Sequence, residues 1–259
     1  MSLVETDWLE KNISFVKIID CSWHMPQTNR NGFEEYKKQH IPNSIFFDLD
    51  ANSKKEINLP HMLVGQKNWE VIVSKMGIKK EDKIVIYDNS DVISSCRCWF
   101  NFIYFGHDPR LVHVLNGGLK KWIKENKEVT NAVTAIKTSD YKSFEKKELV
   151  KNKELIDQNI DKQEFKVIDA RSKERFNGDV PEPRKGLRSG SIKNSFCIPF
   201  NYCLNEDKTF KDKNELKLVF ETCLNNTYEK NIVFSCGSGV TACVLALAYS
   251  LINDKYHPC

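Results

Sequence analysis

The stretch Ile232-Val-Phe-Ser-Cys-Gly-Ser-Gly-Val-Thr-Ala242 decides how this chain of 259 residues is interpreted. Four strand-forming residues lead into Cys236, a short loop with two glycines follows, and residues 241–252 are apolar on nearly every face, which predicts a buried helix. A strand, a glycine loop and a helix direct backbone N–H groups and a helix N-terminus at one point. The sulfur of Cys236 would lie at that point, which favours a nucleophilic cysteine.

Two other readings of this cysteine follow from the same residues. A buried structural cysteine before a core helix is the simpler one, because free cysteine is among the most buried residue types. Phosphatases with a cysteine loop form another class, and they need an arginine after five intervening residues. That position is Ala242, and no arginine follows Cys236 in the chain. Phosphate-ester chemistry is therefore not expected.

The loop resembles the active loop of the 3-mercaptopyruvate sulfurtransferases, which belong to the rhodanese superfamily. Thiosulfate-type rhodaneses usually carry basic residues after the cysteine, where this chain has Gly237 and Ser238. The resemblance implies that sulfur is carried as a persulfide of Cys236, without a cofactor or a metal. It also implies that the substrate is bound by the rest of the loop, namely Gly237, Gly239, Val240 and Thr241.

The chain carries an internal repeat. Short apolar strands alternate with helical segments, which predicts βαβ units and mainly parallel sheets flanked by helices, an α/β fold. Asp20 aligns with Asp169 at an offset of 149 residues, and residues 84–88 align with 232–236 at an offset of 148. Nearly constant offsets imply two tandem copies of one domain, and the resemblance identifies both copies as rhodanese-like.

The repeat predicts the domain boundaries. We expect a first domain over residues 1–130, a polar linker over 131–147 and a catalytic domain over 148–259. Asp88 takes the position of Cys236 in the first copy, and a carboxylate cannot carry sulfur, so the first domain is expected to be silent. The counterpart of residues 112–122 would begin near position 260, so we expect the second domain to be truncated.

Arg175 and Arg184 lie in a stretch that is rich in glycine and proline, Arg175-Phe-Asn-Gly-Asp-Val-Pro-Glu-Pro-Arg184. This stretch resembles the substrate loop of mercaptopyruvate sulfurtransferases. The resemblance implies that both arginines bind the carboxylate and the ketone oxygen of the substrate. A guanidinium offers a rigid fork of donors that matches a carboxylate. The alternative is that both are surface arginines.

His40 lies in His40-Ile-Pro-Asn-Ser44, which resembles a signature of the first rhodanese domain. The resemblance implies that His40 and Ser238 form a serine-protease-like relay beside Cys236, at a site between the two domains. The alternative is a histidine that only braces a loop.

Composition limits the remaining classes of function. The net charge of +4 is small and its basic residues are scattered, so no nucleic-acid partner is expected. The first residues and the rest of the sequence lack a long apolar run, so we expect neither a signal peptide nor a membrane-spanning segment. Nine cysteines without paired spacing argue against disulfides and structural zinc, and they favour a reducing cytoplasm. We expect no metal site.

The sequence therefore predicts a sulfurtransferase that moves the sulfur of 3-mercaptopyruvate through Cys236 to a thiol, such as thioredoxin, or to cyanide, with release of pyruvate. Three alternatives stay open. The same cysteine could use thiosulfate as its donor. The chain could be an inactive truncated remnant that acts as a binding module. Cys236 could also serve as a redox sensor.

Overall fold

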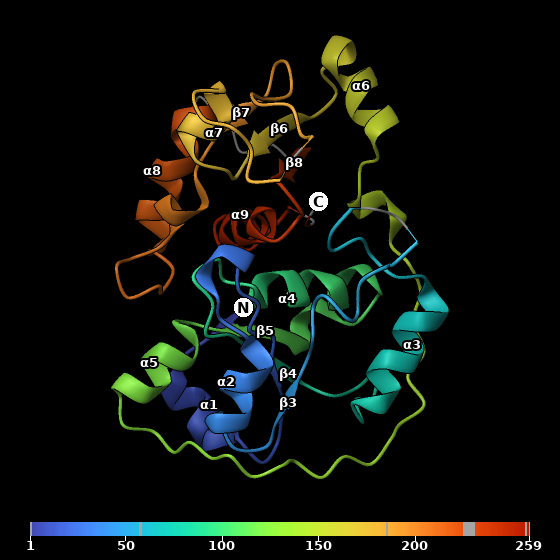
Figure 1. The fold of residues 1–259 in the computed structure, drawn as a ribbon, viewed down its shortest axis with the longest axis vertical. Helices are drawn as coiled ribbons and strands as arrows, with labels where there is room; N and C mark the ends of the chain where they lie inside the picture. Colours follow the sequence, from blue (N-terminus) through green and yellow to red (C-terminus); the bar gives the residue numbers. More distant parts are fainter. Residues whose placement is uncertain (1, 57–58, 185, 225–230, 257, 259) are drawn as a thin grey trace. The chain divides into compact units, whose positions relative to one another are not determined.

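The computed structural model describes residues 2–56, 59–184, 186–224, 231–256 and 258. The chain divides into two compact units, residues 1–146 with 207–209 and residues 147–206 with 210–259. In Figure 1 the first unit runs from blue to green and the second from yellow to red. Each unit has its own parallel sheet, flanked by helices, so the predicted α/β class is confirmed.

The first unit is built on a five-stranded sheet in the order β1-β5-β4-β2-β3, in which every pair is parallel. Its strands are β1 (Leu3–Val4), β2 (Lys17–Asp20), β3 (Ser44–Phe46), β4 (Ile84–Tyr87) and β5 (Val112–Leu115). All four residues of β4 are fully buried, because helices cover both faces of the sheet.

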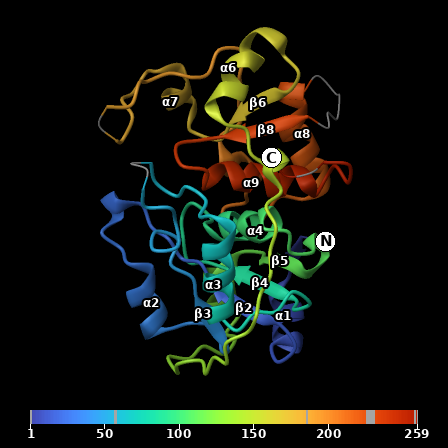
Figure 2. The same cartoon turned by 90° about the vertical axis from the view of Figure 1, so that its right-hand side faces the viewer.

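The helices of the first unit are α1 (Thr6–Asn12), α2 (Gly32–Lys38), α3 (Gln66–Lys75), α4 (Ser95–Tyr104) and α5 (Gly118–Lys124), with 3-10 turns η1 (Pro26–Thr28) and η2 (Pro109–Leu111). Leu9 of α1 and Trp122 of α5 pack against Val85 on one face of the sheet. The α3 residue Trp69 stacks on Phe105, with ring centroids 4.7 Å apart, in a separate aromatic cluster. Figure 2 shows α3 and α4 beside the strands from a second side.

The second unit has a three-stranded parallel sheet in the order β7-β6-β8 among its described residues. Its strands are β6 (Lys166–Asp169), β7 (Phe196–Cys197) and β8 (Ile232–Ser235). Its helices are α6 (Lys153–Lys162), α7 (Lys173–Asn177), α8 (Lys213–Leu224) and α9 (Thr241–Ser250), with 3-10 turns η3 (Lys147–Leu149) and η4 (Phe200–Cys203). The rings of Phe220, Phe234, Tyr249 and Tyr256 form an aromatic core.

The two sheets share one pairing register. Lys17 of β2 pairs with Ile84 of β4, and in the second unit Lys166 of β6 pairs with Ile232 of β8. The residue after β4 is Asp88 and the residue after β8 is Cys236, so these two residues occupy the same place. A parallel sheet presents the residues after its strands at one edge, which is where ligands bind in such folds.

Among the residues that the structure describes, no helix combines the length and the apolar character needed to cross a membrane.

Candidate active site

Cys236 follows β8 directly and is half-buried at the start of the loop that enters α9. The backbone N–H of Gly239 donates to its Sγ, with nitrogen and sulfur 3.1 Å apart. Gly239 has a φ of 75°, in the left-handed region that glycine adopts without a steric penalty. The loop therefore curls back on the sulfur at Gly239, whereas Gly237 does not adopt a positive φ.

Helix α9 fixes the loop from its other end. Val240 and the eight α9 residues from Ala242 to Tyr249 are buried, so the helix is held by apolar contacts on every side. The thiol of Cys243 donates to the carbonyl oxygen of Gly239, at 3.0 Å. A rigid helix thus holds Gly239, whose N–H donates to the sulfur. Ser238 and Thr241 are half-buried beside it.

Both predicted arginines reach the loop. A methyl group placed on Gly237 would lie 3.3 Å from Nη2 of Arg175 and 3.8 Å from Nη2 of Arg184. Nη2 of Arg184 also donates to the carbonyl oxygen of Gly237. The structure therefore brings two guanidinium groups to the residue that follows Cys236.

Local sequence explains the position of Arg175. It lies on the short helix α7, which Ser172 caps by accepting from the Arg175 backbone N–H. Gly178 ends the helix with a φ of 87°, so the chain turns sharply into the proline-rich segment. The segment that follows this turn ends at Arg184, the second predicted arginine.

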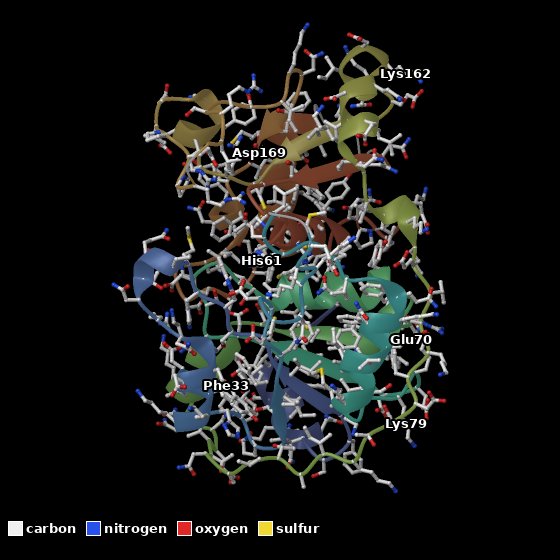
Figure 3. The ribbon with its side chains drawn as sticks, turned by 45° about the vertical axis from the view of Figure 1, so that its right-hand side comes forward. Phe33, His61, Glu70, Lys79, Lys162 and Asp169 are labelled. Carbon is white, nitrogen blue, oxygen red and sulfur yellow. The ribbon has the colours of Figure 1, made fainter. Side chains whose placement is uncertain are left out.

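A ladder of ions holds Arg175, and sequence reasoning missed it. Asp169 binds Arg171 through three contacts of 2.7–3.1 Å. Arg171 donates to Glu182 at 2.9 Å, and Glu182 accepts from Arg175 at 3.0 and 2.6 Å. Figure 3 labels Asp169, at the end of β6. Asp169 already marks the repeat in the sequence, but nothing in the sequence pairs Arg171 with Glu182.

Glu182 is the central carboxylate of this ladder, and its side chain is 4% exposed. The hydrogen bonds from Arg175, and then the charges of Arg175 and Arg171, hold the pKa of Glu182 below its usual value. A buried carboxylate stays ionised only when partners of this kind compensate for its lost hydration.

His40 belongs to the first unit and is 1% exposed. Its Nδ1 lies 2.6 Å from the carbonyl oxygen of Tyr36 and its Nε2 lies 3.1 Å from that of Ala132. The ring also stacks on Tyr36, with centroids 4.0 Å apart. Carbonyl oxygens of its own unit thus lie beside both ring nitrogens of His40, and its relay with Ser238 stays a prediction.

Asp88 fills the loop of the first unit with its own carboxylate. The backbone N–H groups of Ser90 and Ser95 donate to it at 2.7 and 2.8 Å. Burial raises the pKa of Asp88 above its usual value. A carboxyl group thus takes the place that the sulfur of Cys236 takes in the second unit.

In the described ranges, no three histidine, cysteine, aspartate or glutamate side chains are arranged to bind a metal ion.

Comparison with known proteins matches the chain to a model of the rhodanese-like domain twice, over residues 5–125 and 152–257. A thiosulfate/3-mercaptopyruvate sulfurtransferase of Arabidopsis thaliana is 37% identical over 95% of this chain and 70% of its own length. The 3-mercaptopyruvate sulfurtransferase of Homo sapiens is 31% identical over 99% and 88%. The thiosulfate sulfurtransferase of Bos taurus is 34% identical over 95% and 85%.

The fold has solved counterparts as well. The crystal structure of SseA from Escherichia coli, described as a 3-mercaptopyruvate sulfotransferase with the rhodanese fold, superposes with a TM-score of 0.87. That similarity covers 97% of this chain and 94% of the other, at 28% identity.

Proposed function

Because this chain belongs to the rhodanese-like domain family, we propose that it is a sulfurtransferase that takes sulfur from 3-mercaptopyruvate onto Cys236 and passes it to a thiol. The predicted family and the predicted class of enzyme are both supported by the relatives, which are named as 3-mercaptopyruvate and thiosulfate sulfurtransferases. The choice of 3-mercaptopyruvate rests on the site itself.

The observation that carries this choice is the pair of guanidinium groups at Gly237. A donor whose sulfur contacts Cys236 must place its other end a few ångströms away. A 2-oxo acid carries a carboxylate and a ketone oxygen there, and both accept hydrogen bonds. Arg175 and Arg184 supply N–H donors at that distance, and Arg184 also supplies a positive charge.

The first half-reaction is a displacement at sulfur. The thiolate of Cys236 attacks the thiol sulfur of 3-mercaptopyruvate, and an S–S bond forms as the C–S bond breaks. The electron pair of that bond stays on carbon, which gives the enolate of pyruvate. The proton of the donor thiol ends on that carbon, so pyruvate leaves and Cys236 holds a persulfide. Atoms and charges balance without an added oxidant or cofactor.

We assign the proton transfer to Ser238, whose hydroxyl lies two residues beyond the nucleophile on the same loop. The N–H of Gly239, 3.1 Å from Sγ, stabilises negative charge on the Cys236 sulfur before it attacks, and again when Cys236 leaves as thiolate in the second half-reaction. Gly237, Val240 and Thr241 complete the loop that surrounds the persulfide.

In the second half-reaction a thiol attacks the outer sulfur, and Cys236 leaves as thiolate. The acceptor then carries the persulfide, and with cyanide the product is thiocyanate. Two half-reactions on one nucleophile give ping-pong kinetics. We propose a protein thiol such as thioredoxin as the acceptor because Cys236 is only half-buried and its loop is partly exposed.

Thiosulfate is the second candidate donor, because several relatives are named thiosulfate sulfurtransferases. Its outer sulfur would be transferred to Cys236 and sulfite would leave. The loop of this chain offers Gly237 and Ser238 after the cysteine and no basic side chain, so we propose thiosulfate as the poorer donor.

We place the protein in the cytoplasm. The eight cysteines in the described part of the chain form no disulfides, which is usual in reducing compartments. One Arabidopsis relative is named mitochondrial, so cell fractionation that includes mitochondria is the test.

The intact mass of the purified protein tests the proposed function. After 3-mercaptopyruvate, we expect a gain of one sulfur atom that cyanide removes, and no gain in Cys236→Ser. Cys223→Ser is the matched control, since Cys223 is also a half-exposed free thiol of the second unit, and it should gain sulfur normally. Folded wild-type protein that gains no sulfur would instead support the remnant or the redox sensor.

A further inference from the structure

Within the proposed function, we propose that Glu182 is a positioning residue that selects the charge of the sulfur donor. It neutralises Arg175 and thereby leaves one surplus positive charge beside the Cys236 loop. A site of this kind favours a donor with one negative charge over a donor with two.

The first step of the proposal is that Glu182 occupies one edge of the Arg175 guanidinium. Both of its oxygens are used by Arg175, through Nε at 3.0 Å and Nη2 at 2.6 Å, and Oε1 also accepts from Arg171. This is the bidentate edge of the Arg175 guanidinium. A substrate therefore cannot use that edge and must bind the remaining N–H groups of Arg175.

The balance of charges carries the second step. Apart from the thiolate of Cys236, which the N–H of Gly239 faces, Arg171, Arg175 and Arg184 bring three positive charges, and Asp169 and Glu182 bring two negative charges. Among the described residues, Arg184 contacts a neutral group, the carbonyl oxygen of Gly237. The surplus charge thus lies on Arg184, at the residue that follows the nucleophile.

The two sulfur donors differ in the number of negative charges that they carry. 3-Mercaptopyruvate carries one negative charge at neutral pH on its carboxylate, whereas thiosulfate carries two. This network offers no second uncompensated cation to the second negative charge of thiosulfate. That charge would therefore be desolvated without an ion-pair partner, which is unfavourable. Removing the charge of Glu182 would release Arg175 and give the site two surplus charges.

The test compares the two donors in Glu182→Gln. We expect kcat/KM to fall for 3-mercaptopyruvate and to rise for thiosulfate, so that the thiosulfate-to-mercaptopyruvate ratio increases about tenfold, equivalent to about 1.4 kcal/mol. Raising the salt concentration should shrink this difference. The matched control is Glu174→Gln on α7, which makes the same change of charge on an exposed side chain and should leave the ratio unchanged.

Two further measurements separate charge from structure. Glu182→Asp keeps the charge, so its donor ratio should stay near that of the wild type even if both rates fall. In the wild type, lactate should inhibit persulfide formation more strongly than malonate, a dianion of similar size, and this comparison needs no variant.

Equal loss with both donors in folded Glu182→Gln, or tighter inhibition by malonate in the wild type, would overturn the proposal. Such results leave the proposed function standing, because the wild type would still gain sulfur at Cys236. A wild type that gains no sulfur from either donor would instead refute the proposed function.

Discussion

At the scale of single residues, the absence of a side chain at Gly237 is as important as the groups around it. The residue is exposed, its φ is not in the left-handed region, and two guanidinium nitrogens face it. Alanine would therefore suit the backbone, and only the arginines would be displaced. A substitution at Gly237 can therefore change the positions of the two arginines without changing the stability of the fold.

We expect Gly237→Ala to lower kcat/KM for 3-mercaptopyruvate about tenfold, because small displacements of binding groups are costly in catalysis. Its free energy of unfolding should stay within about 0.5 kcal/mol of the wild type, as for other surface changes. Steady-state kinetics and thermal melting measure the two effects. Gly65→Ala adds the same methyl group in the first unit, where no atom lies within 4 Å, and should leave the kinetics unchanged. Unaltered kinetics in Gly237→Ala would contradict the placement of the arginines.

At the scale of elements, the catalytic loop depends on α9. Its apolar residues are buried all round, so the helix is held by packing, and Cys243 in its first turn binds the carbonyl oxygen of Gly239, whose N–H donates to the sulfur. The ladder from Asp169 plays the same part for α7, which is too short to be stable alone. The loop that α9 supports and the arginine that α7 carries thus lie side by side at Gly237, although different interactions hold the two helices.

Leu245→Ala should therefore destabilise the second unit by about 2–5 kcal/mol, because Leu245 is completely buried in α9 and the change leaves a cavity. Denaturant unfolding followed by circular dichroism measures the loss. Leu218→Ala on α8 is the control, since that leucine is 65% exposed and its truncation should cost less than about 0.5 kcal/mol. Similar losses in both variants would show that α9 is not a packed support.

At the scale of the whole molecule, equivalent aspartates in the two units have different hydrogen-bonding partners. Asp169 and Asp20 both end the strand beside the active-loop strand, but Asp169 pairs with Arg171 whereas Asp20 accepts from the backbone N–H of Ser22. Burial raises the pKa of Asp20 to about 7, with a smaller contribution from the charge of Asp88. One unit therefore uses a buried ion ladder, and the other holds a carboxyl group that is easily protonated.

This difference predicts a pH dependence of stability. Between the unfolded value of about 3.8 and the folded value of about 7, the folded chain keeps a proton that the unfolded chain releases. The contribution of Asp20 thus falls as pH rises through this window and levels off above it. We expect Asp20→Asn to gain about 1–3 kcal/mol relative to the wild type between pH 5 and pH 8.

Denaturant titrations at both pH values provide the measurement for Asp20→Asn. Asp161→Asn, a change at an exposed carboxylate, should follow the wild-type profile. A difference between Asp20→Asn and the wild type that is the same at pH 5 and pH 8 would refute the assignment.

The sequence by itself determined the strands, the glycine loop at Cys236 and the repeat, because periodic apolar residues and glycine conformations are local properties. It also indicated the family, through the loop and the two arginines. It missed β1, because two residues are too few for a periodic signal. The helix expected over 241–252 ends at Ser250.

Only the tertiary structure decided how the charged groups are paired. Glu182 contacts Arg171 and Arg175, which lie 11 and 7 residues before it, and the surroundings of His40 include Ala132, which is 92 residues away. Such contacts depend on the folded path of the chain, and no local pattern specifies them. The charge that the site offers to its substrate is a sum over these pairs, so it follows from the fold and not from any single motif.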